Sequence, residues 1–272
     1  MIKVAVIGAC GRMGSSIIKA LQSRANMKLV CAVESEHNPY LGKDVGEAVG
    51  IERRGVKLVS STSLDETLKD CKPAVLVDFT NANAAVDNMK TAARNSVNLV
   101  IGTTGFSEKQ SKEIEAAIKE AGVSAVVSPN MATGVNVFFK IAQAAAGILK
   151  DYEVEIIEAH HRFKKDSPSG TALRVGELIV KELDGNLEES AVYGRKGAGQ
   201  RPPREIGFHS IRAGDIVGEH TVLYAGEGER LEITHRAHSR DPFVRGAIDA
   251  IEFVDGKKDG KIYNTWDVLG IS

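Results

Sequence analysis

Apolar positions in the first half of the chain form short continuous runs, each followed by a polar turn or a stretch with helical spacing. The runs cover residues 3–7, 27–33, 56–59, 74–79, 97–101 and 123–127. Continuous apolar runs of this length are typical of strands buried on both faces of a parallel sheet. Helices are predicted at residues 11–24, from 63, at 82–94 and from 107 to about 122. Repeated strand–helix units predict a doubly wound α/β domain with helices on both faces of the sheet.

Two of these helices begin with the signature of a capping box, in which a serine is followed three residues later by an acid or amide. The two segments are Ser63-Leu64-Asp65-Glu66 and Ser107-Glu108-Lys109-Gln110. Gly122 marks the end of the second of these helices, because glycine readily adopts the left-handed conformation that terminates a helix.

The second half of the chain has helices first and consecutive strands afterwards. Helices are predicted at residues 135–149 and 171–183, and strands at 153–159, 206–211, 216–224 and 231–237. Residues 185–205 are rich in Gly, Pro and charged residues and are predicted to form a long loop that leaves the main body of the domain. Asp241 and Pro242 favour the start of a last helix, with the acid as its N-cap. This order predicts an α+β domain with a mixed or largely antiparallel sheet.

Composition narrows the classes of function. The chain has 272 residues, enough for two domains with their own cores, and 43% of them are hydrophobic. Its 35 basic and 36 acidic residues give a formal net charge of −1, which argues against nucleic acid or a membrane surface as partner. Residues 1–7 are apolar but run into glycines, so we expect a first strand, not a signal peptide. Three cysteines without metal or disulfide spacing favour a reducing cytoplasmic setting.

A glycine-rich turn follows the first predicted strand and opens the first predicted helix. Its sequence is Gly8-Ala9-Cys10-Gly11-Arg12-Met13-Gly14, with Cys10 at the place of the middle glycine of the commoner fingerprint. Glycines let the backbone approach a pyrophosphate, and the helix N-terminus offers it free N–H groups. Such a motif by itself is a weak signal. Its position between strand and helix favours a Rossmann-like domain that binds a nicotinamide dinucleotide.

Glu34, at the end of the second strand, strengthens this interpretation, because an acid there normally binds the adenosine ribose. Its charge also repels a 2′-phosphate, and Ser35 supplies no cation. NADH is therefore expected to bind at least as well as NADPH, although Arg12 leaves use of both open. Turns at Asp78-Phe79-Thr80 and Gly102-Thr103-Thr104-Gly105 follow later strands, where ligands bind in open sheets; ordinary turn chemistry explains each equally well.

Most of the chemically reactive side chains lie in residues 158–171, which read EAHHRFKKDSPSGT. Ser169-Gly170-Thr171 opens a helix with free N–H groups and two hydroxyls, a natural receptor for a carboxylate. Neighbouring cations would hold an anion, and a histidine or lysine would donate a proton. His160 and His161 are adjacent and point apart on an extended chain, so zinc is not expected. A solvated basic loop is the plain alternative; beside a dinucleotide fold, a small anionic substrate is the better interpretation.

These motifs occur together in one known family. The glycine turn, Gly102–Gly105, residues 130–136, the 158–171 loop and the segment IRAGDIVGEH at 211–220 appear in the same order. The whole chain resembles the 4-hydroxy-tetrahydrodipicolinate reductase family of the diaminopimelate–lysine pathway. The resemblance implies a dinucleotide-binding domain of residues 1–129 and 240–272, and an inserted domain of 130–239 for substrate binding and assembly into a homotetramer. The histidine–lysine loop is its most specific motif.

The resemblance also implies roles for individual residues. His160 corresponds to the proton donor or acceptor and Lys164 to a second proton donor. The substrate, a cyclic dicarboxylate, would be bound by His161, Ser169, Gly170 and Thr171. NADH or NADPH would be bound by Gly8, Ala9, Cys10, Gly11, Arg12, Met13, Glu34, Gly102, Thr103, Thr104, Ser128, Pro129, Asn130 and Met131.

Two positions depart from the family pattern. Ser35 replaces an arginine that some members use for the phosphate of NADPH, and Phe163 stands where some members have a third histidine. The expected reaction is hydride transfer to the substrate ring, protonation by His160 or Lys164, and loss of water. Other two-domain dehydrogenases, such as aspartate or homoserine dehydrogenase, lack the 158–171 loop. A dinucleotide sensor without turnover has no need of proton donors beside a carboxylate receptor.

Overall fold

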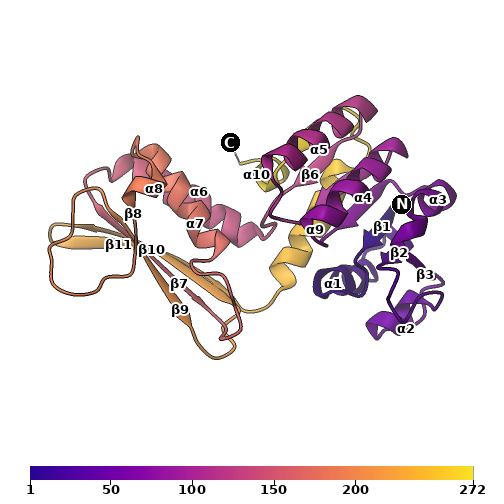
Figure 1. The fold of residues 1–272 in the computed structure, drawn as a ribbon, viewed down its shortest axis with the longest axis horizontal. Coiled ribbons are helices and arrows are strands. Elements are labelled where there is room, and N and C mark those ends of the chain that lie inside the picture. The colour runs from indigo at the N-terminus through magenta and orange to yellow at the C-terminus, as the bar shows by residue number, and fades with distance from the viewer. Residues whose placement is uncertain (272) are drawn as a thin grey trace. The chain divides into compact units, whose positions relative to one another are not determined.

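Contacts in the computed structural model, which describes residues 1–271, divide the chain into two units (Figure 1). The first comprises Met1–Thr133 and the chain from Phe243 onward, and the second comprises Gly134–Pro242. The second unit is thus an insertion in the first, and the chain returns to the first unit for its last residues.

The first unit is built on a seven-stranded sheet with the order β12-β6-β5-β4-β1-β2-β3, in which each paired neighbour is parallel. Its strands are β1 (Ile2–Ile7), β2 (Met27–Glu34), β3 (Leu58–Ser60), β4 (Val75–Asp78), β5 (Asn98–Ile101), β6 (Ala125–Val127) and β12 (Ile262–Tyr263). Its helices are α1 (Arg12–Leu21), α2 (Val45–Val49), the 3-10 turn η1 (Ser61–Ser63), α3 (Leu64–Cys71), α4 (Ala82–Arg94), α5 (Glu108–Ala121), α9 (Asp241–Val254) and α10 (Thr265–Leu269).

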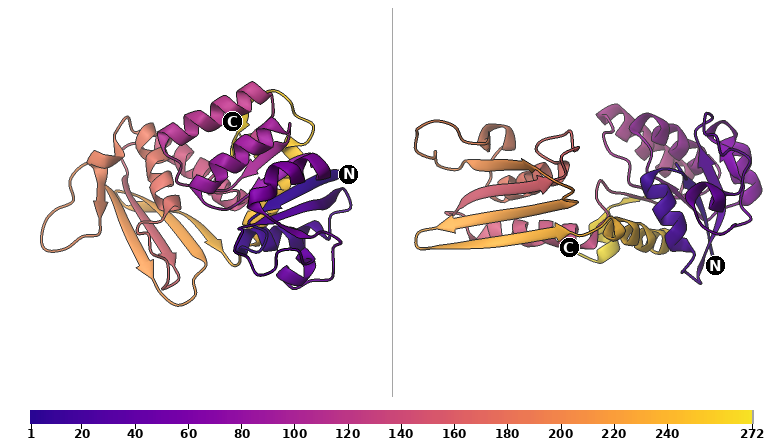
Figure 2. Two further views of the ribbon diagram at one scale, coloured as in Figure 1. Left: turned by 45° about the vertical axis from the view of Figure 1, so that its right-hand side comes forward. Right: turned by 90° about the horizontal axis from the view of Figure 1, so that it is seen from below.

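Alternate residues of each strand point to opposite faces of this sheet, and each face has its own apolar core. Val4 and Val6 of β1 pack with buried residues of α1 and α9 on one face. Ala5 and Ile7 pack with buried residues of α3, α4 and α5 on the other (Figure 2). Helices therefore cover both faces, which confirms the predicted doubly wound fold. The carboxyl ends of β1, β2, β4 and β5 share one edge of the sheet.

The second unit has a mixed five-stranded sheet with the order β11-β10-β7-β9-β8. Its elements are α6 (Thr133–Ile148), β7 (Glu153–His160), α7 (Gly170–Glu182), α8 (Leu187–Ser190), β8 (Ala191–Tyr193), β9 (Ile206–Arg212), β10 (Gly218–Gly226) and β11 (Glu229–Ala237). β10 pairs antiparallel with β7 and β11, while β7, β9 and β8 run parallel. The prediction of a mixed sheet is confirmed.

Helices α6 and α7 pack on one face of the mixed sheet. The hydroxyl of Tyr224 on β10 donates a hydrogen bond to the carbonyl of Ala142 on α6 at 2.6 Å. Phe208 of β9 lies against Gly176 of α7, where a Cβ would meet the ring at 2.6 Å. The buried positions of β10 include His220, and those of β7 include Glu158. Two polar side chains thus stand where the strand pattern places apolar ones.

Several local predictions differ from the structure. Ser63 does not cap α3: within residues 1–271 its side chain accepts no capping hydrogen bond, because the preceding residues form η1, which Ser60 caps instead. The capping box at Ser107 is confirmed, and Gly122 ends α5 in the left-handed conformation with φ of 66°. α9 begins at Asp241, whose N–H donates to the Ser239 hydroxyl at 3.1 Å.

The strand and helix of residues 187–193 were not predicted, because segment 185–205 is dominated by Gly, Pro and charge. The short elements α2, β12 and α10 were missed for a related reason. Each has only two to five residues, too few for a hydrophobic period to show.

Candidate active site

The glycine-rich turn lies between β1 and α1, as predicted. Gly8 has φ of +66°, a conformation that residues with a Cβ rarely adopt. A Cβ on Gly14 would stand 2.1 Å from the Gly8 carbonyl oxygen, so only glycine allows α1 to start this close to the turn. The N-cap of α1 is Gly11, which has no side chain to satisfy the first N–H groups of the helix. Those groups and the positive end of the helix dipole remain available to a phosphate.

Glu34 is held at the end of β2 by two backbone groups. The Cys10 N–H donates to its Oε2 at 2.9 Å, and the Ser35 N–H donates to its Oε1 at 2.9 Å. Both oxygens keep a lone pair for further donors, such as the hydroxyls of a ribose. Burial of the Cys10 thiol, together with the nearby Glu34 charge, raises the pKa of this cysteine. Cys10 is therefore a neutral, small neighbour of the carboxylate.

A cleft of about 680 Å³ lies along this edge of the sheet. Four of the predicted cofactor residues line it: Gly8, Cys10, Gly11 and Glu34. Its other lining residues were outside the predicted set, and they are Ile7, Ser35, Asn38, Ser61, Thr62, Phe79, Thr80, Asn81, Ala84, Asp87 and Asn88. Thr80 belongs to the turn after β4, whose sequence is equally compatible with ligand binding and with an ordinary turn. A cleft of this size and polarity fits part of a dinucleotide.

The remaining predicted cofactor residues lie elsewhere in the first unit. Ala9 and Met131 are buried in the core, Arg12, Thr104 and Pro129 are exposed, and Met13 is partly buried against the core. The structure thus brings some members of the predicted set to the cleft and leaves others outside its walls.

Asp78, at the end of β4, links the turns after β4 and β5. Its fully buried carboxylate accepts hydrogen bonds from the Thr80 N–H at 2.8 Å and the Asn88 amide at 2.7 Å. The Thr103 hydroxyl also donates to it, at 3.2 Å. Gly102 packs on the Phe79 ring so closely that a Cβ would lie 1.8 Å from it. Asp78 therefore sets the position of both turns, of which only the turn after β5 contributes residues to the predicted cofactor set.

The 128–131 segment is held by the C-terminal part of the chain. The Thr265 hydroxyl at the start of α10 donates to the Ser128 hydroxyl at 2.7 Å, and the Ser128 hydroxyl donates to the Asn130 carbonyl at 3.0 Å. Both Ser128 and Thr265 are buried. Residues far apart in sequence thus fix the conformation of this segment.

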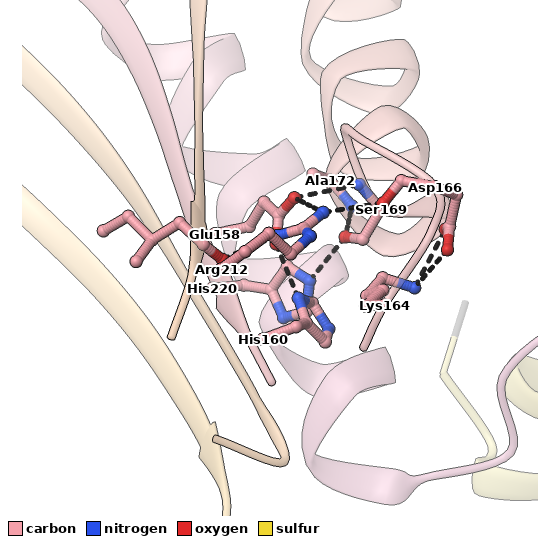
Figure 3. A network of polar contacts seen from close by, with 9 residues as sticks. Glu158, His160, Lys164, Asp166, Ser169, Ala172, Arg212 and His220 are labelled. Atoms are coloured by element: carbon pink, nitrogen blue, oxygen red, sulfur yellow. Dashed lines mark hydrogen bonds and ion pairs between the residues drawn. The ribbon is translucent and has the colours of Figure 1, made fainter. Parts of the chain in front are cut away.

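In the second unit, the carboxylate of Glu158 is the centre of a polar network (Figure 3). Its side chain is 1% exposed. Arg212 of β9 donates to Oε1 at 2.6 Å and to Oε2 at 2.8 Å. The backbone N–H of Ser169 donates to Oε1 at 3.2 Å. Burial alone would raise the pKa of Glu158, but the hydrogen bonds from Arg212 and His160 outweigh it and lower the pKa to about 2. The carboxylate is therefore ionised.

His160 is oriented by this carboxylate. Its Nδ1 lies 2.5 Å from Glu158 Oε2, and an ionised carboxylate accepts, so Nδ1 carries a proton. Burial lowers the pKa of His160, and the hydrogen bond and charge of Glu158 only partly offset this. The ring is thus a neutral imidazole whose Nε2 presents a lone pair. A histidine held in this way by an acid is a common arrangement for proton transfer.

His220 of β10 lies beside His160, with the two ring centroids 5.2 Å apart in an edge-to-face arrangement. Its Nε2 is 2.9 Å from the Ser169 hydroxyl oxygen. That same oxygen accepts the Ala172 N–H at 3.2 Å, which makes Ser169 the N-cap of α7. Burial and the nearby His160 lower the pKa of His220 to about 3. The predicted residues Ser169 and His160 therefore belong to one hydrogen-bonded cluster.

The other predicted catalytic and substrate-binding residues lie in the loop that follows β7 and in the first turn of α7. The Lys164 ammonium forms hydrogen bonds at 2.8 Å to both carboxylate oxygens of Asp166. The ring of His161 is 6.3 Å from the exposed Phe163 ring. Gly170 and Thr171 form the first turn of α7, with Gly170 exposed and Thr171 half-buried.

Sequence reasoning did not assign Glu158, Arg212 or His220 to the site. Each was quoted only as part of a motif, and they lie on three different strands. The signal that could have found them is the presence of Glu158 and His220 at positions of β7 and β10 where the alternation calls for apolar residues. Buried polar residues of this kind require partners and mark functional sites.

No helix among residues 1–271 is both long and apolar enough to cross a membrane. In that same part of the chain, no group of three or more His, Cys, Asp or Glu side chains is arranged to hold a metal ion.

Comparisons with known proteins agree in both halves of the chain. Residues 2–131 match the family model described as "Dihydrodipicolinate reductase, N-terminus", and residues 134–269 match "Dihydrodipicolinate reductase, C-terminus". The chain is 57% identical over 273 residues to the 4-hydroxy-tetrahydrodipicolinate reductase of Methanocaldococcus jannaschii, covering 100% of this chain and 98% of the relative. It is 53% identical to that of Methanothermobacter thermautotrophicus, with both chains covered in full.

Solved structures show the same likeness. A dipicolinate-bound dihydrodipicolinate reductase from Paenisporosarcina sp. TG-14 superposes with a TM-score of 0.77, at 26% identity and with 98% of each chain covered. An amine dehydrogenase from Mycobacterium smegmatis shares the fold at 15% identity, with a TM-score of 0.64 over 94% of this chain and 92% of that one.

Proposed function

The chain belongs to the dihydrodipicolinate reductase family, and we propose that it reduces 4-hydroxy-tetrahydrodipicolinate to tetrahydrodipicolinate in diaminopimelate and lysine biosynthesis. It is an oxidoreductase that uses a nicotinamide cofactor. The observation that carries the proposal is the cluster in the second unit. There, an ionised buried Glu158 orients His160 and accepts the backbone N–H of Ser169, the N-cap of α7, whose first turn is the proposed carboxylate receptor.

We assign the dinucleotide to the first unit and the substrate to the second. The assignment of the dinucleotide is supported by the fit of the cleft in the first unit. Gly11 has no side chain to cap the first N–H groups of α1, which would bind the pyrophosphate. The two carboxylate oxygens of Glu34, held by backbone N–H groups, would accept hydrogen bonds from a ribose. When bound, the reduced nicotinamide supplies the hydride that the reaction requires. Asp78 would position Thr80 and Thr103 near the same cofactor.

The substrate is a ring with two carboxylates, and the second unit has complementary groups for both. One carboxylate would be bound by the Ser169 hydroxyl and the N–H groups of Gly170 and Thr171, at the positive end of the α7 dipole. His161 and Lys164 would bind the second. The relative whose structure holds dipicolinate, a planar pyridine dicarboxylate, supports a dicarboxylate as ligand.

The side chains also account for the proton that the reaction consumes. Hydride addition to the ring requires a proton, and loss of water gives tetrahydrodipicolinate. Lys164 is the proposed charged donor, and its ion pair with Asp166 holds it within the loop that precedes α7. The neutral His160, with its Nε2 lone pair, is suited to accept a proton and pass it on. Glu158 stabilises the imidazolium while the proton resides there.

NADH is proposed to bind at least as well as NADPH. The carboxylate of Glu34 would lie close to the 2′-position of the adenosine ribose, where a phosphate would be repelled. Ser35 offers no positive charge, and its N–H is already bonded to Glu34. Arg12 is exposed at the start of α1, within the glycine turn. It would be the cation available to a 2′-phosphate.

We further propose a cytoplasmic homotetramer. The three cysteines, Cys10, Cys31 and Cys71, are all free thiols, which suits a reducing compartment. The resemblance to the family supports assembly through the mixed sheets of the second unit. Light scattering should then give a mass four times that of the 29.1 kDa chain; a monomer in solution would contradict the assembly.

Turnover is tested by following oxidation of NADH and of NADPH while the substrate is generated from pyruvate and aspartate semialdehyde by a synthase. Oxidation that requires the synthase is the expected result. The control omits the synthase but keeps both of its substrates. Folded protein that binds NADH but oxidises neither cofactor would contradict the proposal and favour a dinucleotide sensor.

A further inference from the structure

The hydrogen bond between His220 and Ser169 has two possible directions, because either group can donate. The direction determines what the Ser169 hydroxyl offers to a ligand. Ser169 is 2% exposed and His220 5% exposed, so bulk water does not compete for the hydrogen bond between them, which Figure 3 draws as a dashed line. A hydroxyl has one proton and two lone pairs. One lone pair of the Ser169 oxygen already accepts the Ala172 N–H at 3.2 Å. The direction of the 2.9 Å contact with His220 Nε2 therefore decides where the serine proton points.

The surroundings of the other ring nitrogen give the answer. Nδ1 of His220 is buried and has no hydrogen-bond partner among residues 1–271. A neutral imidazole carries its single proton on one of its two nitrogens. A proton on Nδ1 would leave a buried N–H without an acceptor, and such orphaned donors are rare in folded proteins. The proton therefore belongs on Nε2, where it is donated to Ser169.

With His220 as donor, both lone pairs of the Ser169 oxygen are occupied and its proton is free to point elsewhere. The backbone N–H of Ser169 is not free, because it donates to Glu158 Oε1 at 3.2 Å. The N–H groups of Gly170 and Thr171 precede the first backbone hydrogen bond of α7, which runs from the Leu173 N–H to the Ser169 carbonyl at 3.0 Å. The receptor thus offers one hydroxyl proton and two N–H groups.

We propose that His220 is a positioning residue that fixes the Ser169 hydroxyl as a hydrogen-bond donor toward the substrate carboxylate. A carboxylate only accepts hydrogen bonds, so a hydroxyl presenting a lone pair would repel it. This inference rests on the proposed function, which places a carboxylate at the start of α7. His220 itself does not contact the ligand and acts on it only by orienting the Ser169 hydroxyl.

The opposite tautomer has the opposite consequence. If Nε2 were bare, Ser169 would donate to it and present a lone pair to the carboxylate. Removal of the ring would then release the hydroxyl proton for the ligand and strengthen binding. The sign of the change on removing the ring therefore separates the two arrangements.

The test measures calorimetric binding of pyridine-2,6-dicarboxylate to the full-length protein saturated with NADH. His220→Leu should weaken binding about tenfold, because Ser169 is no longer held as a donor to a charged ligand. His220→Gln, which retains a side-chain N–H, should recover most of the affinity. In a Ser169→Ala background, His220→Leu should change the affinity by less than about twofold, because the two residues act as a unit. His235→Leu, which alters the cross-strand neighbour of His220, is the matched control and should bind like wild type.

Unchanged or tighter binding by His220→Leu, with normal binding by wild type, would overturn the inference. Failure of wild type to bind the dicarboxylate would contradict the proposed function itself, and with it the carboxylate role of His220. Nitrogen NMR of histidine-labelled wild type checks the tautomer without any variant. A protonated Nε2 and a bare Nδ1 on His220 are expected, and the reverse assignment would overturn the inference even if the variants fail to fold.

Discussion

Glu158 and Arg212 form a two-point ion pair across neighbouring strands of the second unit, with distances of 2.6 Å and 2.8 Å between their nitrogens and oxygens. Glu158 is completely enclosed, whereas the Arg212 side chain is 19% exposed. Arg212 holds the carboxylate of Glu158 in place, and that carboxylate in turn orients His160 and accepts the N–H of Ser169. Its contribution is therefore both to stability and to the geometry of the proposed active site.

Arg212→Ala is expected to lower the free energy of unfolding by about 3–5 kcal/mol, because it leaves a buried charge without its counter-ion. Urea denaturation at neutral pH measures the change. Arg230→Ala is the matched control, because Arg230 forms an exposed ion pair with Glu232 on β11. Exposed pairs contribute less than about 1 kcal/mol. Equal effects of the two substitutions would show that the buried pair has no special role.

The pH dependence of stability provides a second prediction. The pKa of Glu158 is lowered to about 2 in the folded protein, from an ordinary value of 4.5. A lowered carboxyl pKa adds stability above the unfolded value, and that stability is lost as pH falls through the folded value. Wild type should therefore exceed Glu158→Gln by a constant margin above about pH 5. The margin should shrink as pH falls from about 4.5 toward 2.

Denaturation of wild type and Glu158→Gln at a series of pH values measures this margin. Other carboxylates titrate in both proteins and cancel in the difference. If the margin stays the same down to about pH 2, the partners of Glu158 do not lower its pKa in the folded protein.

Lys164→Ala is expected to reduce kcat by about 10²–10⁴-fold without unfolding the protein, because it removes the proposed proton donor. The coupled oxidation assay measures kcat, and thermal unfolding checks the fold. Lys165→Ala is the matched control, since it removes an exposed cation from the adjacent position. Near-normal turnover of Lys164→Ala would contradict its assignment as a proton donor.

Glu34→Gln is expected to improve use of NADPH relative to NADH by about tenfold, or 1.4 kcal/mol, because it removes the charge that we propose repels a 2′-phosphate. The ratio of kcat/KM for the two cofactors measures the change. Glu36→Gln removes an exposed charge two residues further on and should leave the ratio unaltered. If Glu34→Gln has no effect on the ratio, the assignment of Glu34 to the adenosine ribose is wrong.

Much of the architecture could be predicted because buried parallel strands leave a local signal. The apolar runs of residues 3–7 and 27–33 match β1 and β2 to within a residue, and the predicted helix at 82–94 coincides with α4. The cap at Ser63 could not be predicted, because whether a serine caps depends on the backbone before it. Here η1 turns the chain early, and Ser60 takes that role.

The sequence by itself determined the two-part organisation, the glycine turn beside β1, and the loop that carries His160, Lys164 and Ser169. These features depend on residues close together in the chain, so spacing and residue type reveal them. Only the tertiary structure decided which side chains meet. Glu158, Arg212 and His220 come from three strands, and their union depends on the order β10-β7-β9 and its register. Strand order and register are set by the packing of the whole sheet, which no local pattern of residues contains.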